Sequence, residues 1–480
     1  MQLLNIFSKK TLPFWILTIT AIVGLVVSQL IQDGMFLDGM LYTSVSLNLA
    51  EGRGTFWDTH FSKTVYDSFH EQPPLYFAML ALFYKVLGTS IYVERVFVLV
   101  MLSATALYIH KFWRLIFIKE EEVAKNSWLP ILFWITMPVC FWAYTNHVEE
   151  VVMSFFALTS TYYLYVALLS EDKVYLKILF AGILLFLSSL TKGVQGLFPL
   201  VAIGFYWLTT QKIPFKKALI YSLYLLGIIV GVYGFLLLAV DGVYESYYKY
   251  FESRIVSTFN NERVIDSRFY LVRRLRNELL SMIIITATFI LIKRKTFKRS
   301  EVKPRISIWL ILVGLSGALP LLVTLEQRSF YLVTTLPFFS LAVAMWLGPT
   351  IAPMIERIKT EKLGFKIFKG ITIVLFIGSI VFTALQLGKI KRYKDFLPDV
   401  YAFGEIIPKG EIINAVGDLN DNWGLQTCMI RYNYISLYGG TKKYKYLIIK
   451  KEDPTSIIPI TYKKVPIETQ VLDLYINEGL

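Results

Sequence analysis

The sequence predicts an all-α polytopic membrane protein with about eleven transmembrane helices, followed by a small soluble α/β domain at the C-terminus. Hydrophobic residues make up 55% of the 480 residues and charged residues only 18%, whereas about a quarter of the residues of a soluble protein are charged. The apolar residues form blocks of about 20 residues, the length that crosses a hydrocarbon core. Tyr and Trp flank many of these blocks, as expected for anchors at the membrane interface.

The predicted spans alternate across the membrane, starting with the N-terminus in the cytoplasm. The first span follows Lys9 and Lys10, but it is too long for a signal peptide and no small-residue cleavage site ends it. The predicted spans cover residues 13–32, 93–116, 128–146, 150–169, 175–191, 194–209, 216–240, 279–293, 306–325, 330–348 and 368–387.

Basic residues gather in the short loops that this alternation places in the cytoplasm, at 111–125, 212–217, 293–305 and 357–369. The positive-inside rule explains this pattern and most of the net charge of +14, so the charge does not require a nucleic-acid partner. We therefore expect a multi-pass protein of the cell inner (cytoplasmic) membrane. Its N-terminus would be cytoplasmic and its C-terminal domain periplasmic or extracytoplasmic.

Two domains are expected, a transmembrane catalytic domain at 1–388 and a soluble domain at 389–480. The first has two long outer loops, 33–92 and 241–278. Within the first loop, Leu75–Leu87 is apolar but short for a span, so we interpret it as an interfacial helix.

The soluble domain is predicted from short β-branched or aromatic stretches separated by Asn, Asp and Gly. Glu411–Val416 and Tyr444–Lys450 are the clearest of these and are expected to form strands. The two cysteines, Cys140 and Cys428, lie far apart in the sequence and indicate neither a disulfide framework nor a metal site.

Polar residues that could carry chemistry occur at four places, and the first is Asp38, shortly after the first span. An acid at the membrane surface is ordinarily just solvated. The functional interpretation is a general base beside the bilayer, where a lipid-linked substrate presents its head group. Asp33 is a competitor that spacing alone does not exclude.

The second place is His70-Glu71, ahead of two prolines that fix an extended turn. The third is the outer turn that contains His147, Glu149 and Glu150, where such groups are costly if they face lipid. A Pro-capped helix start and a solvated turn are the structural alternatives. The functional interpretation places these side chains in a cavity that faces Asp38.

The fourth place is Lys192, between two apolar spans, and Arg328 in another outer turn repeats its pattern. Either cation could extend harmlessly to the interface, or it could bind a lipid phosphate. All four places fall on the same side of the predicted membrane, which favours a reaction at the outer leaflet. Lys192 and Arg328 would stabilise the charge on a lipid-phosphate leaving group, and Asp38 would take the proton of the acceptor hydroxyl.

No cofactor is required by this pattern. The sequence contains no ligand cluster with the spacing typical of a metal site, so a divalent metal is possible but not indicated.

At this point the sequence resembles the GT-C glycosyltransferases of the protein O-mannosyltransferase and aminoarabinose–lipid A transferase group (family 39/83-like). The resemblance rests on Asp38 with Tyr42 four residues later, on the Glu71-Gln72-Pro73-Pro74 stretch and on Thr191-Lys192-Gly193, and it covers roughly the first 350 residues. It implies a membrane-embedded fold with interfacial helices in the first outer loop. It also implies a polyprenyl-phosphate or dolichyl-phosphate sugar donor and a single displacement that inverts the anomeric carbon.

The resemblance also implies roles for individual residues. Asp38 matches the catalytic carboxylate, Glu71 the acid of the E-K-P-P-type motif and Lys192 the lysine of the T-K-G motif. Glu150 matches the acid that opens the fourth span, with Glu149 as a one-position alternative. The remaining candidates are Arg328 and Tyr331 near the donor phosphate, and Tyr42, His70 and His147 near the donor or acceptor sugar.

Three positions depart from the pattern of the group. Gly39 follows Asp38 where a second acid is common, Leu41 stands where the lipid A transferases have an arginine, and Gln72 replaces the lysine before the prolines. Two cations for the donor phosphate are therefore missing from their usual places. The candidates to replace them are His70, Arg53 and the arginines of the 241–278 loop.

The expected function is that of a hexosyl- or pentosyltransferase that moves a sugar from a polyprenyl-phosphate-linked donor to an envelope acceptor. The acceptor would be lipid A, another glycolipid, a polysaccharide or a protein. A transporter or flippase of lipid-linked sugars is the alternative, but it predicts inverted halves and polar groups near the midplane. The Asp38 motif argues against a ligase with an undecaprenyl-pyrophosphate donor.

Overall fold

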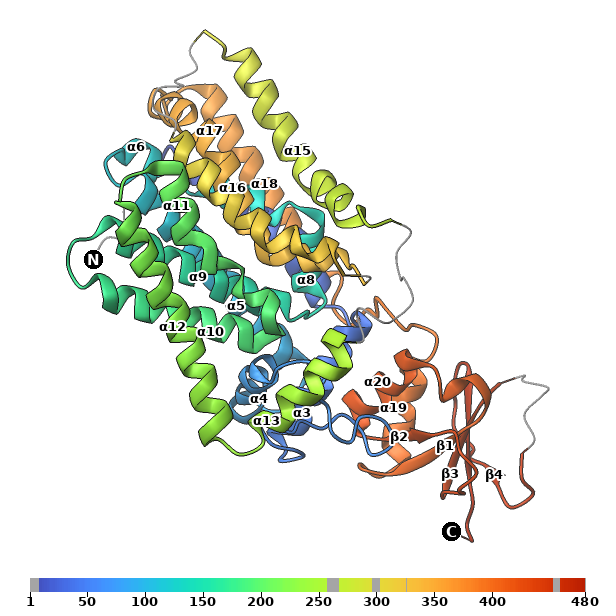
Figure 1. Cartoon of the computed structure of the whole chain (residues 1–480). Coiled ribbons are helices and arrows are strands. Elements are labelled where there is room, and N and C mark those ends of the chain that lie inside the picture. The colour runs from blue at the N-terminus through green and yellow to red at the C-terminus, as the bar shows by residue number, and fades with distance from the viewer. Residues whose placement is uncertain (1–7, 257–266, 296–302, 325, 452–457, 480) are drawn as a thin grey trace.

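The computed structural model describes residues 8–256, 267–295, 303–324, 326–451 and 458–479. It consists of a large helical part with a small sheet domain at one end (Figure 1). The predicted fold class is therefore confirmed: a polytopic helical protein followed by a small C-terminal domain with a sheet. Residues 257–266 of the second long loop and 296–302 of one basic loop lie outside the described residues.

Nine helical stretches among the described residues are long and apolar enough to cross a membrane. A tenth candidate is a pair of helices that meet at 78°, Glu121–Ile135 and Pro138–Thr145. The nine stretches are Leu12–Leu30, Ile91–Ile116, Glu150–Leu169, Val174–Thr210, Phe215–Ala239, Tyr270–Ile292, Pro304–Leu322, Ser329–Glu356 and Leu363–Ala384. The chain is a multi-pass membrane protein.

The helical elements of this region are α1 (Leu12–Ile22), η2 (Val23–Val27), α2 (Ser28–Leu30), α3 (Leu37–Ala50), α4 (Leu75–Leu87), α5 (Ile91–Ile116), α6 (Glu121–Ala124), α7 (Trp128–Ile135), α8 (Pro138–Thr145), α9 (Glu150–Leu169), α10 (Val174–Lys192), η3 (Gly193–Val201), α11 (Ala202–Thr210), α12 (Phe215–Ala239), α13 (Val243–Tyr250), η4 (Phe251–Val256), α15 (Tyr270–Ile292), α16 (Pro304–Ala318), η6 (Pro320–Leu322), η7 (Ser329–Thr335), α17 (Leu336–Glu356) and α18 (Leu363–Ala384).

The stretch Val174–Thr210 contains a reversal of the chain. Gly193, the residue that follows α10 and opens η3, has a φ of 75°. A Cβ atom on Gly196 would lie 2.4 Å from the carbonyl oxygen of Ser188, although residues eight apart in a straight helix are about 12 Å apart. The chain therefore turns back at Gly193, and the two spans predicted at 175–191 and 194–209 are separate segments. This turn accounts for the difference between about eleven predicted spans and the ten candidates.

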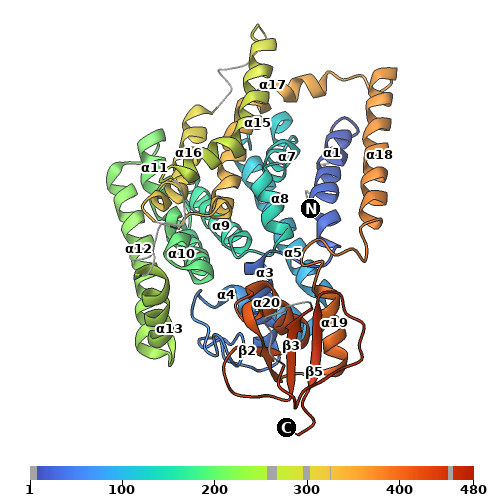
Figure 2. The same ribbon diagram turned by 90° about the vertical axis from the view of Figure 1, so that its right-hand side faces the viewer.

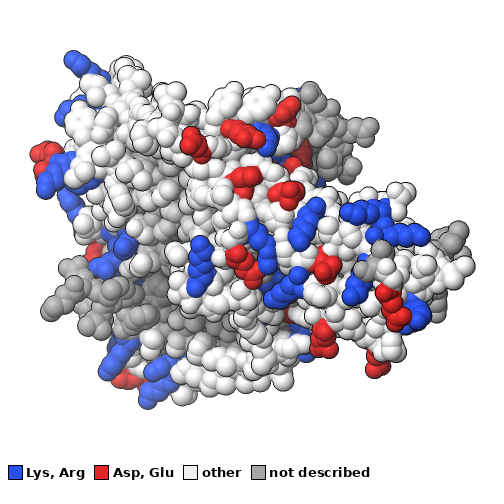
Figure 3. All heavy atoms as spheres, turned by 90° about the horizontal axis from the view of Figure 1, so that it is seen from below, with Lys and Arg blue, Asp and Glu red and all other residues white. Residues whose placement is uncertain are grey.

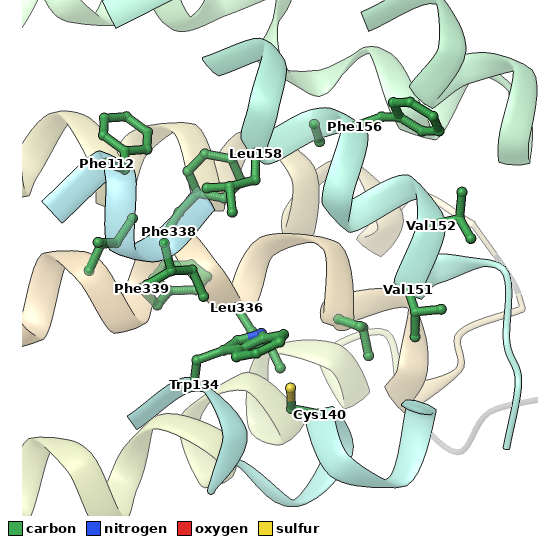
Figure 4. Packing of buried hydrophobic residues seen from close by; sticks show 14 of the residues in the cluster. Phe112, Trp134, Cys140, Val151, Val152, Phe156, Leu158, Leu336, Phe338 and Phe339 are labelled. Atoms are coloured by element: carbon green, nitrogen blue, oxygen red, sulfur yellow. The ribbon is translucent and has the colours of Figure 1, made fainter. Parts of the chain in front are cut away.

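The core of the helical part lies around α9 and α17. The apolar window of the Ser329–Glu356 stretch is 83% buried, whereas those of α12 and α18 are only 17% buried. Figure 4 shows Phe156 and Leu158 of α9 in the same cluster as Phe338 and Phe339 of α17. Helices α12 and α18 therefore lie at the periphery, where apolar side chains face lipid. Helix α18 packs beside α1 at one edge of the molecule (Figure 2).

The first long loop contributes two helices close to the sheet domain. Helix α3 is mostly buried, and α4 has the bounds predicted from the sequence, Leu75–Leu87. Pro74 precedes α4, and Gly88, with a φ of 89°, ends it. The two helices pack against each other and place the residues at their N-termini near the end of the bundle.

The C-terminal domain is a mixed sheet covered by two helices, α19 (Leu397–Ile406) and α20 (Trp423–Asn433), with a short η8 (Gly417–Leu419). Its strand order is β2-β1-β3-β5-β4, in which β1 is parallel to β2 and β3 while β5 is antiparallel to β3 and β4. Two of the strands fall within the two stretches predicted from the sequence. The strands are β1 (Ile412–Ala415), β2 (Ser436–Tyr438), β3 (Tyr446–Lys450), β4 (Lys463–Lys464) and β5 (Leu472–Ile476).

This domain is attached to the helical part through buried polar contacts. Arg431 of α20 forms an ion pair of 2.6 Å with Glu94 of α5, and both side chains are at most 3% exposed. Tyr84 of α4 donates a hydrogen bond to the same carboxylate. Because removing one partner of a buried ion pair typically costs 3–5 kcal/mol, this contact fixes the domain against α4 and α5.

Seen from below, Lys and Arg are interspersed with Asp and Glu on the side where the domain lies (Figure 3).

Candidate active site

Asp38 is held at the N-terminus of α3 by a close contact with the turn between α8 and α9. The backbone N–H of Phe36 donates a 2.8 Å hydrogen bond to Oδ1 of Asn146. A Cβ atom on Gly39 would lie only 2.0 Å from the carbonyl oxygen of Asn146. Position 39 therefore excludes a side chain, which is the local reason why no second acid follows Asp38.

Three cations act electrostatically on the Asp38 carboxylate. Burial raises the pKa of Asp38 above its usual value, and Lys192, Arg328 and Arg254 oppose that shift. The cations come from α10, from the turn before η7 and from η4, so elements far apart in the sequence converge on one carboxylate. Desolvation raises the basicity of the carboxylate, while the cations favour its ionised form.

Lys192 lies between two fully buried glutamates and two aromatic rings. Its Nζ is 2.6 Å from Oε1 of Glu150 and 3.8 Å from Oε2 of Glu149. It is also 5.1 Å from the ring centroid of Tyr331 and 5.7 Å from that of Phe330. One ammonium group thus faces two carboxyl groups at the end of α10.

Glu149 is the less well compensated of the two glutamates. Burial raises the pKa of Glu149 well above its usual range; Lys192 opposes this shift, and the nearby Glu150 and Asp38 add to it. Within the described part of the chain, neither carboxyl oxygen of Glu149 has a hydrogen-bond partner. Burial therefore favours the protonated form of Glu149, next to Lys192.

Arg254 of η4 supplies a cation from the second long loop. It forms an ion pair with Glu71, whose pKa is raised by burial and lowered by this guanidinium. The sequence analysis named the arginines of this loop as candidates to replace the missing cations, but nothing in the sequence singled out Arg254. Arg53, another candidate, lies over the ring of Tyr434 at 3.5 Å and away from the site.

The remaining predicted residues of the group lie at its edges. Arg328 forms an exposed ion pair of 3.2 Å with Glu326. Tyr42 is buried in α3, and its hydroxyl accepts a 3.5 Å contact from Nε2 of Gln72. The structure therefore brings seven predicted residues together: Asp38, Tyr42, Glu71, Glu150, Lys192, Arg328 and Tyr331.

Two predicted residues, His70 and His147, are not part of this group. The ring nitrogens of His70 contact the hydroxyls of Ser68 and Ser246, so the imidazole joins the first loop to α13. His147 has a φ of 55°, and its carbonyl accepts a hydrogen bond from Tyr76. Burial lowers the pKa of His147 well below its usual range. The cations that add to this shift are Lys391, Arg95 and Arg431, none of which acts on Asp38.

Asp33, the competitor of Asp38, is occupied by structural contacts. It accepts hydrogen bonds from Tyr432 at 2.7 Å and from Tyr401, and it lies 3.5 Å from Arg95. These contacts hold the C-terminal domain and leave no role for Asp33 in the group around Lys192. In the described residues no group of three or more His, Cys, Asp and Glu side chains is arranged to hold a metal ion.

A cavity of about 1110 Å³ opens beside this group. Its polar end contains Lys192 and Arg254, and the rest of it is apolar and runs between η3, α11 and α16. The polar lining residues are Gln72, Lys192, Gln195, Tyr250, Arg254, Ser316, Thr324, Glu326 and Tyr331, and the apolar ones include Leu197, Phe198, Phe205 and Leu312. The shape and polarity suit an amphiphile with an anionic head and an apolar chain. The sequence analysis missed this cavity because its lining comes from segments whose packing is not visible in the sequence.

Comparisons with known proteins agree with this architecture. Residues 71–235 match the model of a family described as dolichyl-phosphate-mannose-protein mannosyltransferase. A search of curated protein sequences finds no match to this chain. Among solved structures, ArnT from Cupriavidus metallidurans bound to undecaprenyl phosphate is 11% identical and has a TM-score of 0.62, covering 96% of this chain and 97% of that chain.

Two further structures show the same likeness. The apo state of the same ArnT is 12% identical with a TM-score of 0.63, covering 95% of this chain and 97% of that chain. The oligosaccharyltransferase AglB from Archaeoglobus fulgidus, in complex with an inhibitory peptide and a dolichol-phosphate, is 12% identical with a TM-score of 0.50. In that comparison 89% of this chain and 65% of AglB are covered. At these identities the likeness establishes the fold.

Proposed function

We propose that this chain, whose fold is similar to those of ArnT and AglB, is a membrane glycosyltransferase of the GT-C superfamily that uses a polyprenyl-phosphate-linked sugar donor. The matched family and the ArnT and AglB structures support this assignment, since each carries a lipid phosphate in its description. In our proposal the acceptor is a component of the cell envelope. The reaction takes place on the outer face of the cytoplasmic membrane, where the predicted topology puts Asp38 and the C-terminal domain.

The observation that carries the proposal is the cavity next to Lys192 and Arg254. Its volume of about 1110 Å³ exceeds that of most pockets for drug-sized ligands, which hold about 300–1,000 Å³. A prenyl chain would occupy the apolar part between η3 and α16. The phosphate would then lie at the polar end, within reach of an ammonium and a guanidinium group, both of which bind phosphate strongly.

The chemistry that follows is a single displacement at the anomeric carbon of the donor sugar. The acceptor hydroxyl attacks this carbon, its proton passes to the Asp38 carboxylate, and the bond between the anomeric carbon and the phosphate oxygen breaks. The electron pair of that bond leaves with the polyprenyl phosphate, and the configuration is inverted. Lys192, Arg254 and Arg328 stabilise the charge that develops on the leaving phosphate.

The environment of Asp38 suits a general base. A base works best when its pKa approaches the working pH, and burial shifts the pKa of Asp38 in that direction. Tyr42, Glu71 and Glu150 are proposed to contact the donor sugar, and Glu149, whose protonated form burial favours, is a further proposed contact. His70 and His147 have no part in the proposal, because their contacts hold the loops in place.

The test is sugar transfer in proteoliposomes that contain the purified full-length protein, radiolabelled polyprenyl-phosphate sugars and crude envelope lipids. We expect donor-dependent label in an acceptor, lost in Asp38→Asn and retained in Asp395→Asn, which alters an exposed acid of the C-terminal region. Wild-type turnover in Asp38→Asn would refute the assignment of the base. Movement of the lipid-linked sugar between leaflets without transfer would show a transporter instead.

A further inference from the structure

The linker between α18 and α19, residues 385–396, carries a lysine that reaches back into the helical part. Nζ of Lys391 donates a 2.8 Å hydrogen bond to the carbonyl oxygen of Thr145. Thr145 is the last residue of α8, and the last carbonyl groups of a helix have no partner within it. A lysine near the C-terminus of a helix can satisfy such a carbonyl. Lys391 therefore caps α8 from a position 246 residues further along the chain.

The backbone of the same linker is paired with the segment that leads into α3. The N–H of Lys391 donates to the carbonyl of Asp33 at 2.8 Å, and the N–H of Asp33 donates to the carbonyl of Lys389 at 2.8 Å. A Cβ atom on Gly34, whose φ is 75°, would lie 2.4 Å from the carbonyl oxygen of Arg392. The linker and the start of α3 are therefore held together by backbone contacts.

The turn that follows Thr145 meets the start of α3 directly. Asn146 accepts the N–H of Phe36 on Oδ1, and its Nδ2 donates a 2.9 Å hydrogen bond to the carbonyl of Trp142. The carbonyl oxygen of Asn146 lies so close to Gly39 that no side chain fits there. The linker, the turn between α8 and α9 and the start of α3 thus form a closed set, in which each segment contacts the other two.

This set of contacts adjoins two parts of the candidate site. Asp38 lies in the first turn of α3, one residue before Gly39. At the other end of the turn, Glu149 and Glu150 are fully buried and face Lys192. A shift of the turn would therefore change the position of Asp38 relative to these groups.

A cation is costly at the position of Lys391. Burial lowers the pKa of Lys391 to about 7, and the neighbouring Arg95 and Arg392 add to this shift, while Asp33 opposes it. For stability alone, an uncharged side chain of the same length would suit the position better. The contact with Thr145 is therefore best explained by what it holds in place.

We propose that Lys391 is a positioning residue for sugar transfer: its ammonium group holds the turn between α8 and α9, and through that turn it holds Asp38 in place. The inference rests on the proposed function, because that function makes Asp38 the base. It also gives the linker to the sheet domain a task in the reaction, since the site is incomplete without the linker. Lys391 acts through Thr145 and Asn146 rather than on the sugar.

The first experiment measures amide hydrogen exchange of the full-length protein in nanodiscs and needs no substrate. Lys391→Met removes the ammonium group and keeps the length of the side chain. In this variant the amide of Phe36 should exchange about tenfold faster, because its acceptor Asn146 is no longer held. Lys391→Arg, which keeps a cationic donor, should give an intermediate rate. Lys394→Met is the matched control, since Lys394 is exposed in the same linker, and it should leave the exchange unchanged.

The second experiment compares kcat for sugar transfer in proteoliposomes with affinity for undecaprenyl phosphate and with Tm. In Lys391→Met, kcat should fall about tenfold or more, because the base is misplaced, and Lys391→Arg should restore part of it. Affinity and Tm should stay close to the wild-type values, since the lost hydrogen bond is offset by the removal of a poorly solvated charge. A parallel loss of kcat and Tm would show a purely structural role and overturn the proposal. Wild-type exchange of the Phe36 amide in Lys391→Met would overturn it as well.

A double-mutant cycle with Gly39→Ala tests the route from Lys391 to Asp38. If both changes act through the contact of Asn146 with α3, the double variant should lose little more kcat than Gly39→Ala alone. Losses that multiply would contradict the route through Asn146. If the wild-type protein transfers no sugar, the proposed function fails, and the exchange experiment alone decides whether Lys391 holds the start of α3.

Discussion

Replacing Gly39 with alanine tests whether the contact between α3 and the α8–α9 turn sets the position of Asp38. The new Cβ atom would lie 2.0 Å from the carbonyl oxygen of Asn146, whereas non-bonded atoms prefer about 3.5 Å. The helix and the turn must therefore separate by roughly 1–1.5 Å. The position of a Cβ atom is fixed by the backbone and the carbonyl oxygen belongs to the backbone, so no side-chain rotation relieves the overlap. The nearby 2.8 Å hydrogen bond from Phe36 to Asn146 would lengthen or break.

The expected consequences are large for turnover and moderate for stability. A misplacement of about 1 Å can reduce the rate of a catalysed step about 100-fold, so kcat for sugar transfer should fall by about that factor. Overpacking and the lost hydrogen bond should together cost about 2–4 kcal/mol of stability. Affinity for undecaprenyl phosphate should stay close to the wild-type value, because Lys192 and Arg254 lie on other elements.

The assay compares kcat and donor affinity in proteoliposomes with thermal unfolding in detergent. A thiol-reactive dye reports unfolding, because both free cysteines, Cys140 and Cys428, are buried. Gly204→Ala is the matched control, since a Cβ atom there meets nothing within 4 Å. Wild-type turnover and stability in Gly39→Ala would refute the reasoning about the α3 contact.

Two further predictions concern the charges of the site. Arg254→Gln should lower affinity for undecaprenyl phosphate about ten- to a hundredfold, because a charged hydrogen bond contributes about 1.5–3 kcal/mol. The control is Arg276→Gln, which alters an exposed arginine. Unchanged affinity in Arg254→Gln, or an equal loss in the control, would contradict the phosphate role. Since burial raises the pKa of Glu149, the folded state keeps a proton that the unfolded state releases above about pH 4.3, and stability should fall as pH rises. Glu149→Gln should therefore flatten the decline of Tm as the pH rises above about 4.3, and an unchanged slope would show that another group controls it.

Most of the helical architecture could be predicted because length and hydropathy determine whether a segment can cross a membrane. The two spans predicted at 175–191 and 194–209 are separated by the turn at Gly193, although Val174–Thr210 counts as one helical stretch by length and hydropathy. The 78° bend before Pro138 was not predicted, since a proline within an apolar block signals a kink but not its size. Within the sheet domain, β-branched and aromatic stretches indicated β1 and β3.

The candidate site was only partly predictable from the sequence. Asp38, Lys192 and Glu150 could be named because each is a polar residue next to an apolar block and would be costly without a function. Arg254 could not be distinguished from the other arginines of its loop, because its role depends on how η4 packs against Glu71. His70 and His147 looked equally suitable in sequence, but the imidazole of His70 contacts Ser246, and the cations that act on His147 are Lys391, Arg95 and Arg431 rather than those that act on Asp38.

The choice between Asp33 and Asp38 also depended on tertiary contacts, and it links the C-terminal domain to the site. Asp33 is held by Tyr401, Tyr432 and Arg95, and its backbone pairs with Lys389 and Lys391. Asp38 is only five residues further along the chain, beyond Gly34, where the two segments approach so closely that a side chain is excluded. Any movement of the sheet domain relative to the bundle would therefore be transmitted to α3. The domain thus contacts, through Asp33, the segment that leads directly into the helix that carries Asp38.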